Sequence, residues 1–458
     1  MSFVSHANLP NGNQDILVRP KLYQQAKVHP SQDQPSHYPW FRLAVTPEDQ
    51  VLHFFFHHYV VPESGRSPTH PDCHGIIYKR ATEPGYLANL INAVGLSGLA
   101  YSRNAPTLIS SARQAFSHAL HGICAALADH SEAASDQMLV SVMLLALYET
   151  VSSSFNEDLS SWSKHVDGAL ALIQLRGTGQ LRNRIGRRIF LSLRTEILID
   201  CLQRGLPVPK VLIDLMAEAR RNETEQEAPA ALLADIVVNL CTALPSVEKD
   251  IADEMSLSSY LTGLLRIDAD LEDWAQTLLP AEYGYKTQTK PSDFGEREVF
   301  TRRYDIYHSV EIANTWNLQR CARIILRQTI VEAMSNCLPI SSSLSILLSF
   351  PVSYADLLLT SENVIQESSS DICCSVSYIL HSVDEAGKSS ELRAAYAMHL
   401  LWPLYVAGTT HTASDALRDW IESTMERIRD ATGIQKAKRI ALLLKPRCWG
   451  RLTAIDTN

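Results

Sequence analysis

The chain has 458 residues, of which 46% are hydrophobic and 20% charged, and its formal net charge is −9. This length suits two or three ordinary domains or one large helical one, and the composition excludes a chain disordered over most of its length. Modules dedicated to nucleic-acid binding are usually basic, so the acidic balance argues against a chain built as a whole to bind DNA or RNA.

Nine cysteines are scattered along the chain, and none forms a Cys-x-x-Cys pair. An odd and dispersed set of this kind is typical of reduced thiols in the cytosol or nucleus. The first residues lack the charged and apolar blocks of a signal peptide, and the longest apolar stretches, 138–147 and 400–407, are too short to span a bilayer. We therefore expect a soluble intracellular protein with no membrane segment.

The first 45 residues are rich in Gln, Pro, His, Asn and Ser, and we expect a poorly ordered lead-in over 1–45. Helical order is predicted to begin at Thr46, a suitable N-cap, followed by Pro47 at the first helical position. The apolar residues of this helix recur at helical spacing and form one face, which comprises Val51, Phe54, Phe55 and Tyr59. Residues 63–85 are punctuated by Gly, Pro and His and predict a loop.

Helical periodicity recurs along the rest of the chain. The predicted helices span residues 87–101, 107–128, 137–151, 160–175, 185–203, 211–219, 231–243, 256–279, 304–336, 354–383, 390–407 and 415–431. Ser414 is a suitable N-cap for the last of these helices. No sustained run alternates apolar and polar residues with β-branched enrichment, so no strand is predicted. The predicted fold class is all-α, a large single array of stacked antiparallel helices with no substantial sheet.

The stretch from Trp162 to Gly177 is the most informative in the chain. Its apolar residues Val166, Ala169 and Ile173 lie at helical spacing, and Gly177 is placed to end the helix. The stretch resembles a signature of the regulatory domain of fungal zinc-cluster transcription factors.

Further stretches resemble later elements of the same domain, in the same order. These stretches are residues 187–196, 201–209, 271–274, 316–326, 371–378 and 402–408. The residues that carry the resemblance are Trp162, His165, Asp167, Gly168, Arg176, Gly177, Arg188, Arg194, Trp274, Arg320, Cys373, Ser375, Tyr378, Pro403 and Gly408. One departure is Ser377, which stands where the family commonly has Pro. The resemblance implies an all-helical regulatory domain over residues 46–450, in which these residues are structural.

In that family the regulatory domain follows a DNA-binding zinc cluster, which needs six closely spaced cysteines. This sequence has no cysteine before Cys73 and no cysteine cluster later. The resemblance therefore implies a transcription regulator without its own metal-organised DNA reader, and direct DNA binding is not expected. The alternative is that a segment encoded upstream of this sequence supplies the cluster.

One group of side chains raises the question of a metal site. The group comprises His53, His57, His58, His70, Cys73 and His74. His53 and His57 share a helix face, so a zinc site is conceivable. The spacing matches no recognised metal motif, and we favour polar positions on an amphipathic helix next to a His-rich loop. We predict no metal and no cofactor.

A basic concentration lies between two predicted helices and comprises Arg176, Arg182, Arg184, Arg187 and Arg188. Contact with phosphate or an acidic partner is one interpretation. We favour a solvated loop with ion pairs to neighbouring acids, because no aromatic side chains alternate with the arginines.

No motif predicts catalysis. Ser161 and Lys164 match Ser-x-x-Lys, but the partner motifs of that chemistry are absent. His165 and Asp167 stand two positions apart on a helix and point to different faces, so they do not suit a catalytic pair. The tryptophans are interpreted as core anchors, and we predict that the chain is not an enzyme.

The resemblance implies a fungal regulator of metabolic or secondary-metabolite genes, located in the nucleus, with the cytoplasm as the alternative. Its expected partners are proteins, either the transcription machinery or a DNA-binding relative, and a homodimer is consistent with this role. A small-molecule effector remains open, because helical arrays often enclose pockets between helices. The alternative function is an enzyme or small-molecule binder of a biosynthetic pathway that reuses the same helical domain.

Overall fold

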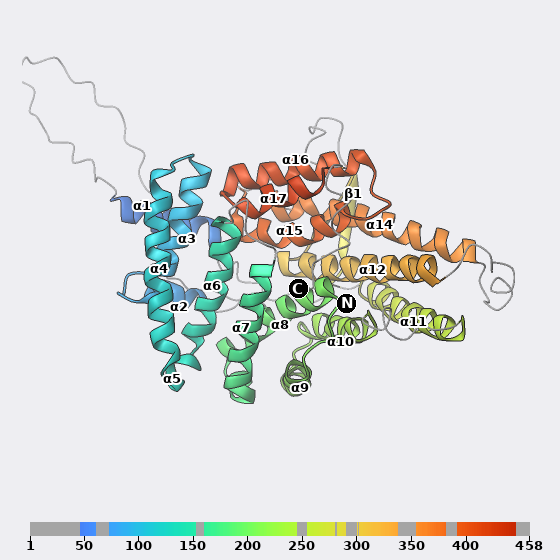
Figure 1. Cartoon of the computed structure of the whole chain (residues 1–458), viewed down its shortest axis with the longest axis horizontal. Helices are drawn as coiled ribbons and strands as arrows, with labels where there is room; N and C mark the ends of the chain where they lie inside the picture. Colours follow the sequence, from blue (N-terminus) through green and yellow to red (C-terminus); the bar gives the residue numbers. More distant parts are fainter. Residues whose placement is uncertain are drawn as a thin grey trace, which may run out of the picture. The chain divides into compact units, whose positions relative to one another are not determined.

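The computed structural model describes residues 46–60, 73–152, 160–244, 254–279, 282–289, 300, 302–337, 354–381 and 392–445. From Thr46 onward the chain belongs to one structural unit. Helices predominate among the described residues, whose strands form a single two-stranded sheet (Figure 1). The predicted all-α class with no substantial sheet is confirmed. The predicted lead-in, residues 1–45, and the end of the predicted domain, residues 446–450, lie outside the described residues.

The elements keep the labels of Figure 1. The helices are α1 (Pro47–Tyr59), α2 (Cys73–Arg80), α3 (Tyr86–Ser102), α4 (Thr107–Leu127), α5 (His130–Ala133), α6 (Asp136–Ser152), α7 (Ser160–Arg176), α8 (Arg184–Arg204), α9 (Lys210–Ala219), α10 (Ala228–Ala243), α11 (Glu254–Leu278), α12 (Val310–Cys337), α14 (Tyr354–His381), α15 (Ala394–Gly408), α16 (Asp415–Thr432) and α17 (Gln435–Leu443). Two 3-10 helices, η1 (Gly177–Arg182) and η2 (Arg220–Asn222), follow α7 and α9. Strands β1 (Tyr285–Thr289) and β2 (Arg303–Tyr307) lie between α11 and α12.

Local signals in the sequence place several helix ends correctly. The Thr46 side chain accepts a hydrogen bond from the backbone N–H of Asp49 (3.1 Å) and caps α1. Ser414 caps α16 in the same way through Leu417 (3.2 Å). Gly205 ends α8 in the left-handed conformation, with φ at 60°. The caps at Thr46 and Ser414 confirm the corresponding predictions.

The hairpin of β1 and β2 corrects the prediction of a helix from residue 304. The strands pair antiparallel, with Tyr285 opposite Tyr307, and the helix begins only at Val310. Aromatic and β-branched residues in β2 favour the extended conformation. Pairing with a strand 18 residues away also buries Asp305 and Tyr307. A strand of five residues is too short to show a clear alternation of apolar and polar residues, so the sequence alone did not reveal this pairing.

Two short helices also differ from the sequence analysis. Helix α2 lies inside the predicted loop 63–85, where Ile77 is buried and the ring of Tyr78 stacks on Phe56 (centroids 4.3 Å apart). Helix α17 follows the last predicted helix and buries Ile440 against the rest of the unit. Both helices are too short for periodicity to reveal them, so packing against neighbouring helices decides their conformation.

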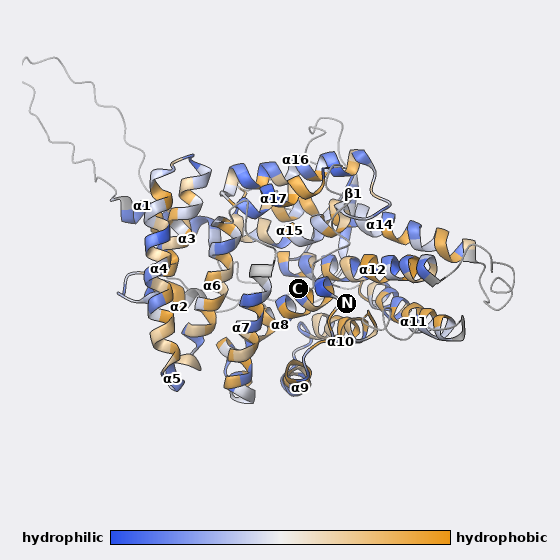
Figure 2. Cartoon of the chain, viewed as in Figure 1, coloured by the Kyte–Doolittle hydropathy of each residue, from blue (hydrophilic) through white to orange (hydrophobic). Residues whose placement is uncertain are grey.

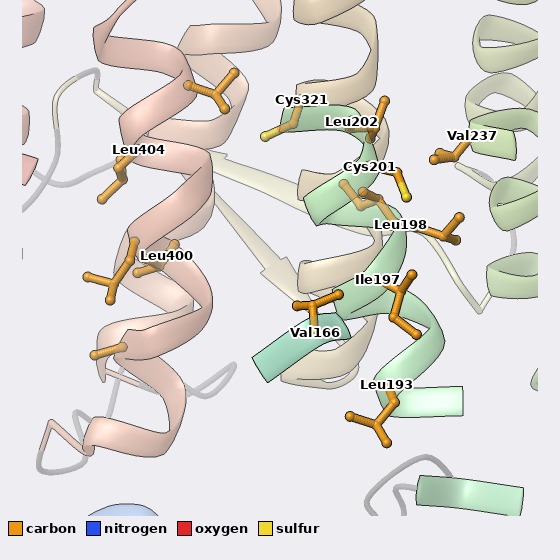
Figure 3. Packing of buried hydrophobic residues seen from close by; sticks show 14 of the residues in the cluster. Val166, Leu193, Ile197, Leu198, Cys201, Leu202, Val237, Cys321, Leu400 and Leu404 are labelled. Carbon is orange, nitrogen blue, oxygen red and sulfur yellow. The ribbon is translucent and has the colours of Figure 1, made fainter. Parts of the chain in front are cut away.

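A continuous hydrophobic core joins helices from both halves of the chain. Helix α8 packs against α6, α7, α10 and α12. Figure 3 shows its side chains Leu193, Ile197 and Leu198 with Val237 of α10 and Cys321 of α12. Figure 2 shows the corresponding composition, because α10 is mostly hydrophobic whereas α16 alternates hydrophobic and hydrophilic stripes.

The C-terminal helices dock onto the first helices of the unit through two glycines. Gly433, between α16 and α17, has φ at 78°, and a Cβ there would lie 2.5 Å from the carbonyl oxygen of Gly98 in α3. The hydroxyl of Tyr59, at the end of α1, donates to the carbonyl of Thr432 (3.2 Å). Burial raises the pKa of this hydroxyl, which therefore stays protonated as a donor. The backbone at Gly433 therefore packs directly on the backbone of α3, and a side chain at position 433 would not fit.

We expect Gly433→Ala to lower the free energy of unfolding by about 1–3 kcal/mol, because the new Cβ meets both a strained φ and the backbone of Gly98. Gly263→Ala in α11 is the matched control. A Cβ there meets nothing within 4 Å, and the substitution is expected to be neutral or stabilising by up to about 1 kcal/mol. Urea unfolding measures both, and equal stability of the two variants would contradict the proposed close approach.

Candidate functional site

Polar contacts to α6 and α8 fix the signature helix α7. The hydroxyl of Ser163 donates to Asp200 Oδ1 (2.6 Å), and Arg204 donates to Asp200 Oδ2 (3.0 Å). On α6, Glu149 Oε1 lies 2.8 Å from His165 Nε2. The signature histidine therefore lies in a contact between two helices, which is a structural position.

Two other signature residues, Asp167 and Gly168, lie on the exposed side of α7. Asp167 is 67% exposed and its nearest cation, Arg204, is 3.9 Å away. A Cβ added at Gly168 would meet nothing within 4 Å. His165 and Asp167 thus face different surroundings, and the structure does not bring them together.

The end of α7 is tied back to α6. Gly177 adopts φ of 55°, which turns the chain into η1. The buried side-chain amide of Gln180 donates to the carbonyls of Ile173 (2.9 Å) and Gly177 (2.7 Å). Arg176 forms an ion pair with Asp136 at the start of α6. These contacts place Arg176 and Gly177 in the packing of three elements.

The basic concentration predicted between α7 and α8 does not form one surface. Arg176 pairs with Asp136, as described above. Arg187 pairs with Glu227 at the start of α10 (2.7 Å) and donates to the carbonyl of Ala219 at the end of α9 (2.8 Å). Arg182 is exposed in η1. Arg176 and Arg187 therefore make interhelical ion pairs, as the favoured interpretation expected. The predicted solvated loop is wrong, because both side chains are largely buried and belong to helices α7 and α8.

In the second half of the chain, signature residues converge on a buried arginine. Arg320, 3% exposed, donates through Nη1 to the hydroxyl of Tyr307 (2.8 Å) and to Asn317 Oδ1 (3.0 Å). Its Nη2 donates to Asp305 Oδ2 (3.2 Å). The guanidinium carbon lies 5.1 Å from the ring centroid of Tyr285. The hairpin thus supplies the acid and the aromatic rings that surround Arg320.

Helix α14 completes this cluster. Asn317 donates to the hydroxyl of Ser375 (2.9 Å), which donates in turn to the carbonyl of Ile372 (2.7 Å). The ring of Tyr378 lies 5.4 Å from that of Tyr307. The neighbouring signature residue Cys373 is buried, and burial raises the pKa of its thiol well above the usual value. Ser375 and Tyr378 therefore join α12, α14 and the hairpin, and the Cys373 thiol is a core side chain.

A second buried carboxylate lies further along α12. Asp268 of α11 accepts from Arg323 Nε (3.0 Å) and from Arg327 Nη2 (2.5 Å). Burial would raise the pKa of Asp268, but its hydrogen bonds and the charges of the two arginines outweigh burial and lower it. In both clusters, therefore, arginines of α12 pair with aspartates of neighbouring elements, Asp305 in β2 and Asp268 in α11.

The remaining signature residues serve packing. The Trp274 ring lies 5.1 Å from that of Trp316, and its indole donates to the carbonyl of Pro229 (2.9 Å). Pro403 is buried inside α15, and a Cβ at Gly408 would lie 2.7 Å from the Leu444 side chain. The side chain of Trp162 lies outside the described part of the chain.

Of the predicted histidine group, the structure describes only the three side chains on α1. The His53 and His57 rings are stacked with centroids 6.0 Å apart, while His58 is buried against Phe54 (4.3 Å). The side chains of His70, Cys73 and His74 lie outside the described residues. Among the residues that are described, no three His, Cys, Asp or Glu side chains converge as metal ligands.

A small cavity between α8, α9 and α10 was not predicted from the sequence. Its polar lining comprises Arg187, Arg194, Arg220, Glu223 and Glu227. Arg194 is only 6% exposed, and burial together with the charge of Arg220 lowers its pKa to about 10. The sequence signal was incomplete, because Arg194 was interpreted only as a structural motif residue.

Two further buried titratable groups interact with each other, Glu196 on α8 and Lys436 on α17. Burial raises the pKa of Glu196 to about 7, against the opposing charge of Lys436. Burial lowers the pKa of Lys436 to about 8, while Glu196 and Glu149 raise it. Because Glu149 also contacts His165, four titratable groups from α6, α7, α8 and α17 interact at this junction.

Comparison with known families confirms the resemblance for the first part of the chain, and the resembling stretches from residue 271 onward lie outside the match. Residues 52–205, about a third of the chain, match the model of the fungal specific transcription factor domain. The range runs from α1 to the C-cap of α8 and includes the signature helix, Arg188 and Arg194. No curated protein and no solved structure matches the chain. In the part of the chain that the structure describes, no helix is long and apolar enough to cross a membrane.

We expect Arg320→Met to lower the free energy of unfolding by about 3–5 kcal/mol, because it leaves the carboxylate of Asp305 buried without its cation. Arg266→Met, at an exposed position of α11, is the matched control and should change stability by less than about 0.5 kcal/mol. Adding Asp305→Asn to Arg320→Met should recover part of the loss. Denaturant unfolding measures all three, and an unchanged midpoint for Arg320→Met would exclude a stabilising role.

The shifted pKa of Glu196 gives stability a defined pH dependence. The unfolded chain releases this proton near pH 4.5 and the folded chain near pH 7. The stabilising contribution is therefore full below about pH 4.5 and is lost as the pH rises through about 7. Between pH 5 and 7.5 we expect the wild type to lose unfolding free energy relative to Glu196→Gln, measured by urea titration. The exposed Glu225→Gln should run parallel to the wild type, and a parallel Glu196→Gln would disprove the shift.

Proposed function

We infer that this chain, which carries a fungal specific transcription factor domain at residues 52–205, regulates transcription in the nucleus. The family match is the observation that carries the inference. The continuous core supports it, because the matched helices and the C-terminal helices together form one unit able to present a fixed surface to a partner. The proposal assigns no catalytic reaction to the chain.

The proposed mode of action is contact with other proteins. The sequence contains no group of closely spaced cysteines that could organise a zinc-cluster DNA reader. The formal net charge of −9 also disfavours binding of the whole chain to nucleic acid. We propose that the chain acts on the transcription machinery or through a DNA-binding relative, alone or as a homodimer. Metabolic or secondary-metabolite genes are its proposed targets, by analogy with the family.

The test is a tethered reporter. The chain is fused to an unrelated DNA-binding domain in a fungal host whose reporter promoter carries that domain's site. Because the chain is proposed to contact the transcription machinery, we expect reporter output to change several-fold relative to the tether alone. Arg266→Met should preserve the effect, and Arg320→Met should remove it by destabilising the fold.

Deletion of the gene followed by transcript sequencing tests the same proposal without a fusion. A changed set of transcripts, restored by the wild type, is the expected result. A silent tethered reporter together with an unchanged transcriptome would reject the regulatory role. Turnover of pathway intermediates by the purified chain would instead support the enzymatic alternative.

A further inference from the structure

We propose that the cavity around Arg194 binds a small monovalent anion, of the size of chloride. The cavity lies where α8, α9, η2 and α10 meet. Neither the family match nor the proposed regulatory function assigns a ligand to this place. The inference stands independently of that function, since it concerns binding by the folded chain alone.

The first observation is an unpartnered buried cation. Arg194 is only 6% exposed, and the Nε atom of its guanidinium has no hydrogen-bond partner. No described carboxylate forms an ion pair with it. Asp235 and Glu223 act on its charge without forming a hydrogen bond to it. A buried guanidinium without a hydrogen-bonded acid is costly, and an anion at hydrogen-bond distance would offset that cost.

The second observation is that the acids near Arg194 are already engaged. Glu227 pairs with Arg187 (2.7 Å), and Glu223 pairs with Arg220 (3.1 Å). Arg220 also pairs with Asp235 on α10. Each of these acids is held by another arginine, so the positive charge of Arg194 remains directed into the cavity. At its pKa of about 10 the guanidinium is still charged at neutral pH.

The size of the cavity limits the ligand. Its volume is about 10 Å³, which is room for about one water molecule. The rest of its lining is apolar and comprises Leu191, Met216, Ala219 and Ala231. The charged part of the lining comprises three arginines and two glutamates, so a small monovalent anion matches both the volume and the surplus positive charge. Arg220, with 32% of its side chain exposed, lies on the solvent side and gives access.

The test is anion-dependent unfolding of the full chain. Sodium chloride or sodium formate replaces sodium gluconate at constant ionic strength, because gluconate is too large for the cavity. We expect the unfolding midpoint to rise saturably with chloride, since a ligand that binds only the folded state stabilises it. Formate tests the size limit, and a rise with formate alone would contradict it.

Arg194→Met is the diagnostic variant. It should weaken the anion dependence at least ten-fold and should be no less stable than the wild type in gluconate, because it removes a buried unpaired charge. Arg182→Met, at an exposed position of η1, is the matched control and should keep the full response. If Arg194→Met fails to fold, the wild-type titration and a bromide soak still decide.

In crystals grown with bromide, an anomalous peak within hydrogen-bond distance of Arg194 is the supporting result. No saturable rise in either salt, or an equal rise in wild type and Arg194→Met, would show that water alone occupies the cavity and would overturn the proposal. So would the absence of an anomalous peak at Arg194. None of these outcomes affects the reporter or transcript measurements.

Discussion

The approach of Gly433 to Gly98 sets the geometry on which the other helices depend. A Cβ at Gly433 would lie 2.5 Å from the Gly98 carbonyl, so this close approach to α3 requires that Gly433 carry no side chain. A Cβ at Gly98 would instead meet Phe54 and Tyr59 of α1. With this contact made, α16 packs on α3 and α17 packs on α6. Lys436 of α17 also interacts electrostatically with Glu196 of α8. One backbone contact thus fixes how the two ends of the unit share a core.

Within that core the chain treats buried arginines in two ways. Arg320 is surrounded by an acid, a hydroxyl and aromatic rings from three elements, so its charge stabilises the position of the hairpin against α12 and α14. Arg194 has neighbours of both signs, but its own guanidinium is left without a hydrogen-bonded acid. The paired Arg320 therefore contributes to packing, whereas the unpaired Arg194 is where we propose an anion.

The sequence predicted whatever depends on local periodicity. Thr46 and Ser414 mark helix starts because a cap acts within one turn, and the α16 face follows from residues three and four apart. The hairpin was not predicted, because its two strands pair across about 18 residues of sequence. Helix α17 was not predicted, because it spans only 9 residues. The signature residues were predicted to be structural, but their partners were not predicted, since Arg320 is linked to Ser375 through Asn317 only in three dimensions. The Arg194 cavity needed η2 and α10 to fold back over α8.

The matched range 52–205 is smaller than the unit that holds it together. It ends with α8, whose remaining side packs on α10 and α12, and its α3 and α6 are covered by α16 and α17. Cut out alone, these helices would expose apolar faces that the later helices bury, including those around Leu198 and Leu202 in Figure 3. The cooperative unit therefore extends through α17. Any signal that alters α8, whether at Arg194 or at Glu196, acts on both the matched and the unmatched part of the chain.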